Sequence, residues 1–444
     1  MAPNYIPALC GFAFFQAFCY LAFESPSLLD AFNMHDDLAQ PLFLLCAIFG
    51  QFIAYALTTM MRLAEQSSSL TKPNWTLALS LTASGLALSW VSCILCVHAS
   101  FDITIPWFVA GAIALGAGSA LVNLLWAHYS CLIEDCRKLY VFVLTANLLS
   151  LAVYFLATHL PRHLVSFFAL GLVVVSTACA AVALFAPQTT SQEDSIGIPM
   201  TTNAFHILWK PALAALLLGF IASLMLQMPH IQDTELSYFQ KIAFISQVVV
   251  IGLLALPTLI GRHQPNFEAL FKIALPLSAA GFALLPLLYQ AGSGIENALA
   301  QLGFGIASML LWCMLAQTSN SQGVPSETIY ATVLGIICLA KICGTLAGVQ
   351  FRAELGKGGV ALTGVSLAAI YLIAMIPMFL FKSRDTQHGA FTEQGEIESR
   401  SDGTHTTQDT GTQTPPARQF AQYVARFNLT PREIEMLDEL AQGR

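Results

Sequence analysis

Long apolar runs, separated by short polar loops, fill most of the first 382 residues of the chain. About twelve of these runs reach the ~20 residues that an α-helix needs to cross a lipid bilayer. The pattern therefore predicts an all-α membrane protein with about twelve transmembrane helices. The runs are centred on Phe14, Phe52, Ala87, Leu115, Leu148, Val174, Leu218, Val250, Ala280, Met309, Cys338 and Ile370.

The apolar runs fall into two groups of six. A polar stretch at residues 188–203 separates the groups. Residues 1–187 and 204–382 are therefore predicted to form the two six-helix halves of one membrane domain, residues 1–382. A layout of two similar halves is typical of transporter folds.

The composition changes after Lys382. Residues 383–426 are rich in Thr, Gln, Ser, Gly and Asp. They cannot bury an apolar core and are predicted to form a flexible linker. Residues 427–444 carry the signals of one short helix, with Thr430 at the N-cap, Pro431 at the first helical position and Glu433 completing a capping box.

Composition and charge agree with a membrane protein. Hydrophobic residues make up 56% of the chain and charged residues 10%, whereas soluble domains carry about 25% charged residues. The formal net charge of −7 offers no basic face for nucleic acid. The 11 cysteines lie mostly in apolar runs and are expected to be buried thiols rather than disulfides.

No group of residues shows the spacing of a catalytic or metal-binding set. The ten histidines are dispersed, mostly at loops and at the ends of spans. The sequence has no HExxH motif, no P-loop and no GxSxG motif in the required context. It therefore predicts no enzymatic activity, no metal site and no cofactor.

Lysine and arginine residues give the expected orientation. With the N-terminus inside, the cytoplasmic loops and span ends hold nine of these residues and the external loops hold four. We therefore expect a multi-pass protein of the bacterial cytoplasmic membrane, with both the N- and C-termini in the cytoplasm.

Lys341 is a full charge in the middle of a predicted span, residues 333–351. A lysine at the bilayer centre costs on the order of 3 kcal/mol, which makes it a candidate functional residue. No acidic residue lies in the middle of any predicted span, so an anionic ligand could supply the counter-charge. The alternative is that backbone carbonyls and Asn or Gln side chains hold the lysine.

Polar and aromatic side chains share faces of other predicted spans. Asn123 and Trp126 lie three residues apart on the fourth run, and Ser308 and Trp312 lie four residues apart on the tenth. The residues predicted to bind a small molecule are Lys341, Asn123, Trp126, Gln16, Ser308 and Trp312. The alternative is that the polar side chains tie helices together and that the aromatic ones pack or anchor at the lipid interface.

The last residues, LTPREIEMLDELAQGR, closely resemble the opening helix of the LuxR-type helix-turn-helix domain, a DNA-binding module. On this resemblance, Thr430, Arg432 and Glu433 mark the start of that domain. The family's recognition helix, which contacts bases, would follow only after Arg444. The resemblance therefore implies DNA as a partner of a longer chain rather than of these residues. It also implies a homodimer, because LuxR-type domains generally act as dimers.

The membrane domain resembles the major facilitator superfamily in its layout. Transporters of that family carry a Gly…Asp-Arg…Gly-Arg loop between the second and third spans, whereas this chain has MRLAEQSSSLTKPNW there. No predicted span carries the interior acid that proton-coupled carriers usually need. The resemblance implies that the first, fourth, seventh and tenth helices line a central cavity.

Two hypotheses for the function follow. The first is a membrane-bound, one-component transcription regulator, in which the transporter-like domain senses a small aromatic or anionic molecule and controls a cytoplasmic LuxR-type domain. The alternative is a major-facilitator-type transporter of a small molecule, with an incidental tail helix. The lipid bilayer and a small molecule are expected partners in both.

Overall fold

The computed structural model describes residues 5–24, 28, 39–64, 75–98, 101–133, 135–185, 202–226, 244–255, 276, 279–280, 283–284, 295–322, 324–356, 363–364, 366–371 and 373–374. The chain divides into two units, residues 1–382 and 383–444, and every described residue belongs to the first unit. The predicted linker and the predicted start of a helix-turn-helix domain, with Thr430, Arg432 and Glu433, therefore lie outside the described residues.

The described residues are almost entirely helical, and none of them forms a strand. Helix α1 ends in a π-helix, η1, which widens its last turn. The helices are α1 (Tyr5–Cys19), η1 (Tyr20–Glu24), α3 (Ala39–Ala64), α4 (Trp75–His98), α5 (Phe101–Cys131), α6 (Cys136–Thr158), α7 (Arg162–Phe185), α8 (Thr202–Met225), α11 (Ile295–Gln322) and α12 (Ser326–Gly356). A further helical segment spans Phe244–Ala255.

Seven of the described helices are long and apolar enough to cross a membrane, and three shorter apolar helices accompany them. All twelve centres predicted from the sequence fall on residues in helical conformation. The number of twelve spans stays a prediction. The all-helical, multi-pass membrane architecture follows from the apolar runs, because a helix satisfies its own backbone hydrogen bonds in lipid.

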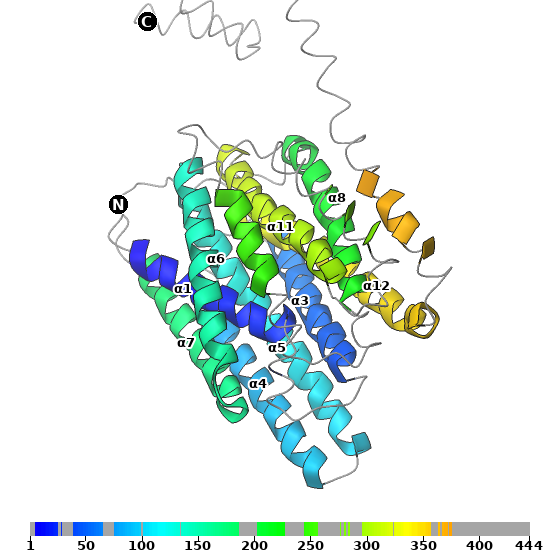
Figure 1. Ribbon diagram of the computed structural model, residues 1–444. Coiled ribbons are helices and arrows are strands. Elements are labelled where there is room, and N and C mark those ends of the chain that lie inside the picture. The colour runs from blue at the N-terminus through cyan, green and yellow to red at the C-terminus, as the bar shows by residue number, and fades with distance from the viewer. Residues whose placement is uncertain are drawn as a thin grey trace, which may run out of the picture. The chain divides into compact units, whose positions relative to one another are not determined.

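The described helices form one bundle (Figure 1), to which both predicted halves, residues 1–187 and 204–382, contribute. In the first half, α1 packs against α6 and α7, and α5 packs against α3 and α4. In the second half, α8 packs against α11 and α12. Corresponding helices of the two predicted halves make corresponding contacts. Helix α1, from the first apolar run, contacts α6, from the fifth, just as α8, from the seventh, contacts α12, from the eleventh. Helix α12 also lies along α3 and so joins the halves.

Glycines bring three helices of the first half into backbone contact. A Cβ atom on Gly116 of α5 would lie 1.9 Å from the carbonyl oxygen of Ala47 on α3. A Cβ atom on Gly50 of α3 would lie 2.2 Å from the carbonyl oxygen of Ile113, and one on Gly85 of α4 would lie 2.4 Å from a backbone nitrogen of α5. Because only hydrogen fits at these positions, small residues set the spacing of α3, α4 and α5.

Candidate functional site

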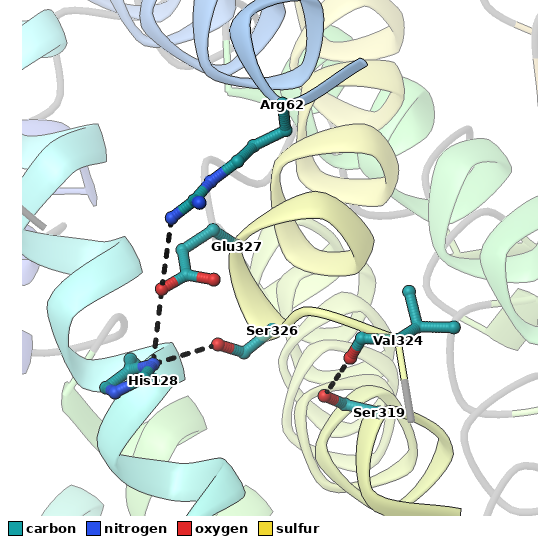
Figure 2. Close-up of polar contacts among 6 residues, drawn as sticks. All are labelled: Arg62, His128, Ser319, Val324, Ser326 and Glu327. Carbon is teal, nitrogen blue, oxygen red and sulfur yellow. Dashed lines mark hydrogen bonds and ion pairs between the residues drawn. The ribbon is translucent and has the colours of Figure 1, made fainter. Parts of the chain in front are cut away.

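A cluster of ionisable and polar side chains, drawn in Figure 2, links the predicted first half with α12 of the predicted second half. Arg62 in the last turn of α3 lies 3.7 Å from Glu327 Oε1 in the first turn of α12. The same oxygen lies 3.2 Å from Nδ1 of His128, in the last turn of α5, and this nitrogen lies 3.1 Å from the Ser326 hydroxyl. We call Arg62, His128 and Glu327 the charge latch, because α3 and α5 belong to the first half and α12 to the second.

The turn between α11 and α12 presents Glu327 to its partners. The Ser319 hydroxyl donates to the carbonyl oxygen of Val324 over 2.7 Å and fixes this turn (Figure 2). Glu327 then falls in the first turn of α12, where the helix dipole favours an acidic side chain. The residue is only 8% exposed. A buried carboxylate that loses its partners is strongly destabilised, so the latch contributes to the contact between the halves.

Five buried aromatic rings pack between the halves near the charge latch. The Phe12 ring centroid lies 5.7 Å from that of Trp126, 5.6 Å from that of Phe142 and 5.5 Å from that of Trp312. The Tyr330 ring lies 4.8 Å from Trp312. We call these five residues the aromatic plug. Three of them come from the first half and two from the second, so the plug fills the space between the halves with side chains.

The two tryptophans that the sequence predicted as ligand contacts belong to this plug. Trp126 Nε1 donates to the Ser176 hydroxyl over 3.0 Å, and Trp312 Nε1 donates to the Ser130 hydroxyl over 3.1 Å. Trp126 is fully buried and Trp312 is 8% exposed. The structure therefore places both side chains in helix packing. The bond between Trp312 on α11 and Ser130 on α5 also crosses from one half to the other.

Polar side chains connect α3, α5 and α12 on the side of the aromatic plug away from the charge latch. Asn123 Nδ2 of α5 donates to the Tyr55 hydroxyl of α3 over 2.9 Å. The nearby amide of Gln51 donates to the Ser119 hydroxyl over 3.1 Å, and the thiol of Cys338 on α12 donates to Gln51 Oε1 over 3.7 Å. Asn123, a predicted ligand contact, thus has a protein partner here.

Lys341 lies on α12 one helical turn after Cys338. It is 14 residues after Glu327, which corresponds to about 21 Å along the helix, and is half-buried. Its Nζ lies 4.4 Å from the centroid of the Phe304 ring on α11. Such a cation–π contact contributes about 0.5–2 kcal/mol, whereas a lysine at the bilayer centre costs on the order of 3 kcal/mol. The ring therefore offsets only part of the cost.

The predicted alternative for Lys341 was a set of neutral protein partners. Among the described residues, no hydrogen bond or ion pair to its Nζ is recorded. The Phe304 ring is the contact that the structure records. The lysine therefore retains unused hydrogen-bonding capacity within the described part of the chain.

Gln16 and Ser308 occupy inward faces on the side of the plug away from the latch. Gln16 lies one turn after Phe12 on α1, and Ser308 lies between Phe304 and Trp312 on α11. Both are half-buried, and neither has a recorded hydrogen bond within the described residues. Of the six predicted ligand contacts, Asn123, Trp126 and Trp312 have hydrogen-bond partners in the protein, whereas none is recorded for Lys341, Gln16 and Ser308 within the described residues.

The charge latch was not predicted from the sequence. Its residues come from the second, fourth and eleventh runs, and each lies at the end of a span, where charged residues are ordinary. The available signal was that Glu327 and Arg62 both fall at ends on the predicted cytoplasmic side. Within the described ranges, no group of three His, Cys, Asp or Glu side chains is placed to hold a metal ion.

Comparisons with known proteins identify the fold. No protein family matches the chain by its sequence profile, and no curated protein matches it by sequence. Among solved structures, the chain is similar to the human organic anion transporter TETRAN, with a TM-score of 0.60 and 16% identity over 84% of this chain and 100% of that one. It is also similar to a bacterial homologue of the iron transporter ferroportin in its outward-facing state, with a TM-score of 0.58 and 13% identity over 86% and 98% of the two chains.

A third similar structure is the proton:xylose symporter XylE, with a TM-score of 0.56 and 13% identity over 86% of this chain and 94% of that one. These findings overturn the regulator hypothesis. The matching structures are transporters over most of the chain, and no comparison supports a LuxR-type domain, a DNA partner or a homodimer. They favour the alternative hypothesis instead. The membrane domain of this chain has a transporter fold of the major facilitator type.

Proposed function

We propose that the protein is a major-facilitator-type transporter that carries a small molecule across the membrane by alternating access. The observation that carries this proposal is the charge latch, which among the described residues links α3 and α5 of the predicted first half with α12 of the predicted second half of a transporter fold. An ion-pair cluster between two halves can be made and broken without unfolding either half. That is what a cycle of opening and closing requires.

The proposed cycle involves the charge latch, the aromatic plug and the residues around Lys341. In the present conformation the charge latch and the aromatic plug close the path on one side of Lys341. A substrate then reaches Lys341, Gln16 and Ser308 from the other side. Substrate that binds one arrangement of the halves better than the other shifts the balance between them. Opening then requires Glu327 to leave Arg62 and His128.

We further propose twelve spans with both termini in the cytoplasm of a bacterial cell, as the Lys and Arg distribution predicts. In that orientation the latch lies on the cytoplasmic side, and the conformation described here opens outward. No catalytic role is proposed for any residue.

Accessibility of one cysteine from the two sides of the membrane tests the proposal without knowledge of the substrate. We would place Cys at Ser308 in a chain whose native cysteines are replaced, and treat right-side-out and inside-out vesicles with an impermeant maleimide. Alternating access predicts labelling from both sides. The matched control is Leu148→Cys, because Leu148 is 56% exposed on the apolar outer surface of α6 and should not be labelled. Labelling of the Ser308 position from one side only would contradict a transport cycle.

A further inference from the structure

We propose that Lys341 and the ring of Phe304 bind the carboxylate and the apolar body of an organic monoanion, and that such monoanions are the substrates. This inference rests on the proposed transport function and adds the chemical class of the substrate to it. It is carried by the position of the lysine, by the residues that surround its stem and by the lack of a counter-charge among the described residues.

The packing of three helices of the second half fixes the direction of the lysine side chain. A Cβ atom on Gly344 would lie 2.2 Å from the carbonyl oxygen of Phe220, so α12 is held against α8 one turn beyond Lys341. The preceding residue of α8, Gly219, has no side chain. A Cβ atom there would lie 3.7 Å from Lys341 Cγ and 3.2 Å from Phe304 Cε2. The aliphatic part of the Lys341 side chain and the Phe304 ring therefore both pack over Gly219 of α8.

The described residues provide no counter-charge for this lysine. Glu327, the acidic residue of the same helix with a described side chain, is already engaged by Arg62 and His128 about 21 Å away. One turn beyond Lys341, the hydroxyl of Thr345 is fully buried and has no hydrogen-bond partner among the described residues. This face of α12 thus holds a cation and a hydroxyl without protein acceptors in the described part of the chain.

The charge expected of the ligand depends on how many cationic side chains lie near Lys341. Arg62 is held in the latch, and Lys138 lies in an exposed pair with Asp135 at the start of α6. Among the described side chains at this depth, Lys341 is the one positive charge that a ligand would meet, which favours a monoanion over a dianion. The Phe304 ring and the Ile337 methyl group beside it favour an apolar body attached to the anionic group.

The test is thermal unfolding of the purified full chain in detergent, with matched pairs of acids and neutral amides. The probes are acetate, hexanoate and benzoate, each against its amide, with sodium chloride at equal ionic strength as the inorganic anion. We expect hexanoate and benzoate to raise the unfolding temperature of the wild type, and their amides and chloride to leave it unchanged. Lys341→Met should lower the affinity for both acids at least about tenfold.

Two further variants keep the test decisive. If Lys341→Met does not fold, Lys341→Gln replaces it, and Lys138→Met serves as the control that removes a lysine from an exposed pair. Phe304→Leu should weaken the binding of benzoate more than that of hexanoate, because it removes the ring but keeps an apolar side chain. An equal shift in the wild type and the Lys341 variant would overturn the proposal. So would the absence of a shift with every acid, or a shift with chloride as large as that with benzoate.

The outcome is separable from that of the transport proposal. Two-sided labelling of the Ser308 position with no effect of the acids would leave transport in place and remove the monoanion site. One-sided labelling together with acid binding that depends on Lys341 would leave the site in place and remove transport.

Discussion

Replacement of Glu327 by Gln should favour the arrangement in which the latch end is open. The Arg62–Glu327 distance of 3.7 Å gives a Coulomb attraction of roughly 4 kcal/mol at an effective dielectric constant of about 20. The two side chains are 20% and 10% exposed, and part of this attraction offsets the cost of removing them from water. A net loss of about 2 kcal/mol is therefore reasonable for the charge alone. That loss should raise the population open at the latch end about 30-fold.

Hydrogen–deuterium exchange with mass spectrometry measures this shift. When opening and closing are fast, the exchange rate of a protected amide follows the equilibrium between closed and open states. In Glu327→Gln, amides in the first turns of α12 and the last turns of α3 should exchange at least about tenfold faster than in the wild type. Amides near Thr345, on the far side of Lys341, should not change in the same direction.

The matched control is Lys138→Gln, which breaks an ion pair of the same 3.7 Å length. Its side chains are 76% and 45% exposed, so the effect should stay below about 1 kcal/mol. Arg62→Gln and the double variant complete a mutant cycle, in which directly paired residues should show a coupling energy of about 0.5–3 kcal/mol. Unchanged protection in Glu327→Gln, or strict additivity of the two single changes, would refute the reasoning.

Three more outcomes follow from the structure. Gly344→Val should lower the free energy of unfolding by about 1–3 kcal/mol, because its side chain meets the Phe220 carbonyl oxygen; thermal or denaturant unfolding measures this change. Gly171→Val should be near neutral, because no described atom outside the local backbone of its own helix lies within 4 Å of its Cβ position. Equal effects of the two changes would contradict the packing argument. Phe12→Ala should cost about 3–5 kcal/mol by removing the central ring of the aromatic plug, whereas Leu148→Ala on the outer surface should cost far less. A reporter that is active only in the cytoplasm, fused after Lys382, should give signal; signal only from a periplasmic reporter would reverse the orientation.

The helices could be predicted from the sequence because lipid leaves the backbone few alternatives. The sequence also shows Lys341 as a full charge within an apolar run, but its role as a ligand contact stays a prediction. The inward faces of Trp126 and Trp312 were also predictable from helical spacing. Their role was not, because it depends on Phe12, a residue of a third helix that fills the space between them. Whether an inward aromatic residue meets a ligand or another ring is decided by packing that one helix does not encode.

The charge latch and the tail illustrate two other limits. Arg62, His128 and Glu327 are ordinary residues at the ends of spans until the halves dock, so their pairing is a property of the assembled bundle. The tail misled the functional hypothesis for the opposite reason. The capping box of Thr430 and Glu433 specifies a helix start, and such a start is common to many proteins. A short local match therefore carried less information about function than the arrangement of the membrane helices.

The glycine contacts of the first half determine how this protein can change shape. At Gly50, Gly85 and Gly116 the backbones of α3, α4 and α5 touch with no clearance for sliding or twisting. A packed interface of this kind has discrete arrangements rather than continuous flexibility. In the proposed cycle we therefore expect α3, α4 and α5 to move together as one rigid group, with Arg62 and His128 at the ends of α3 and α5. A methyl group added at one of these glycines is therefore expected to shift the ends of α3 and α5, and so to alter the opening of the charge latch in the proposed cycle.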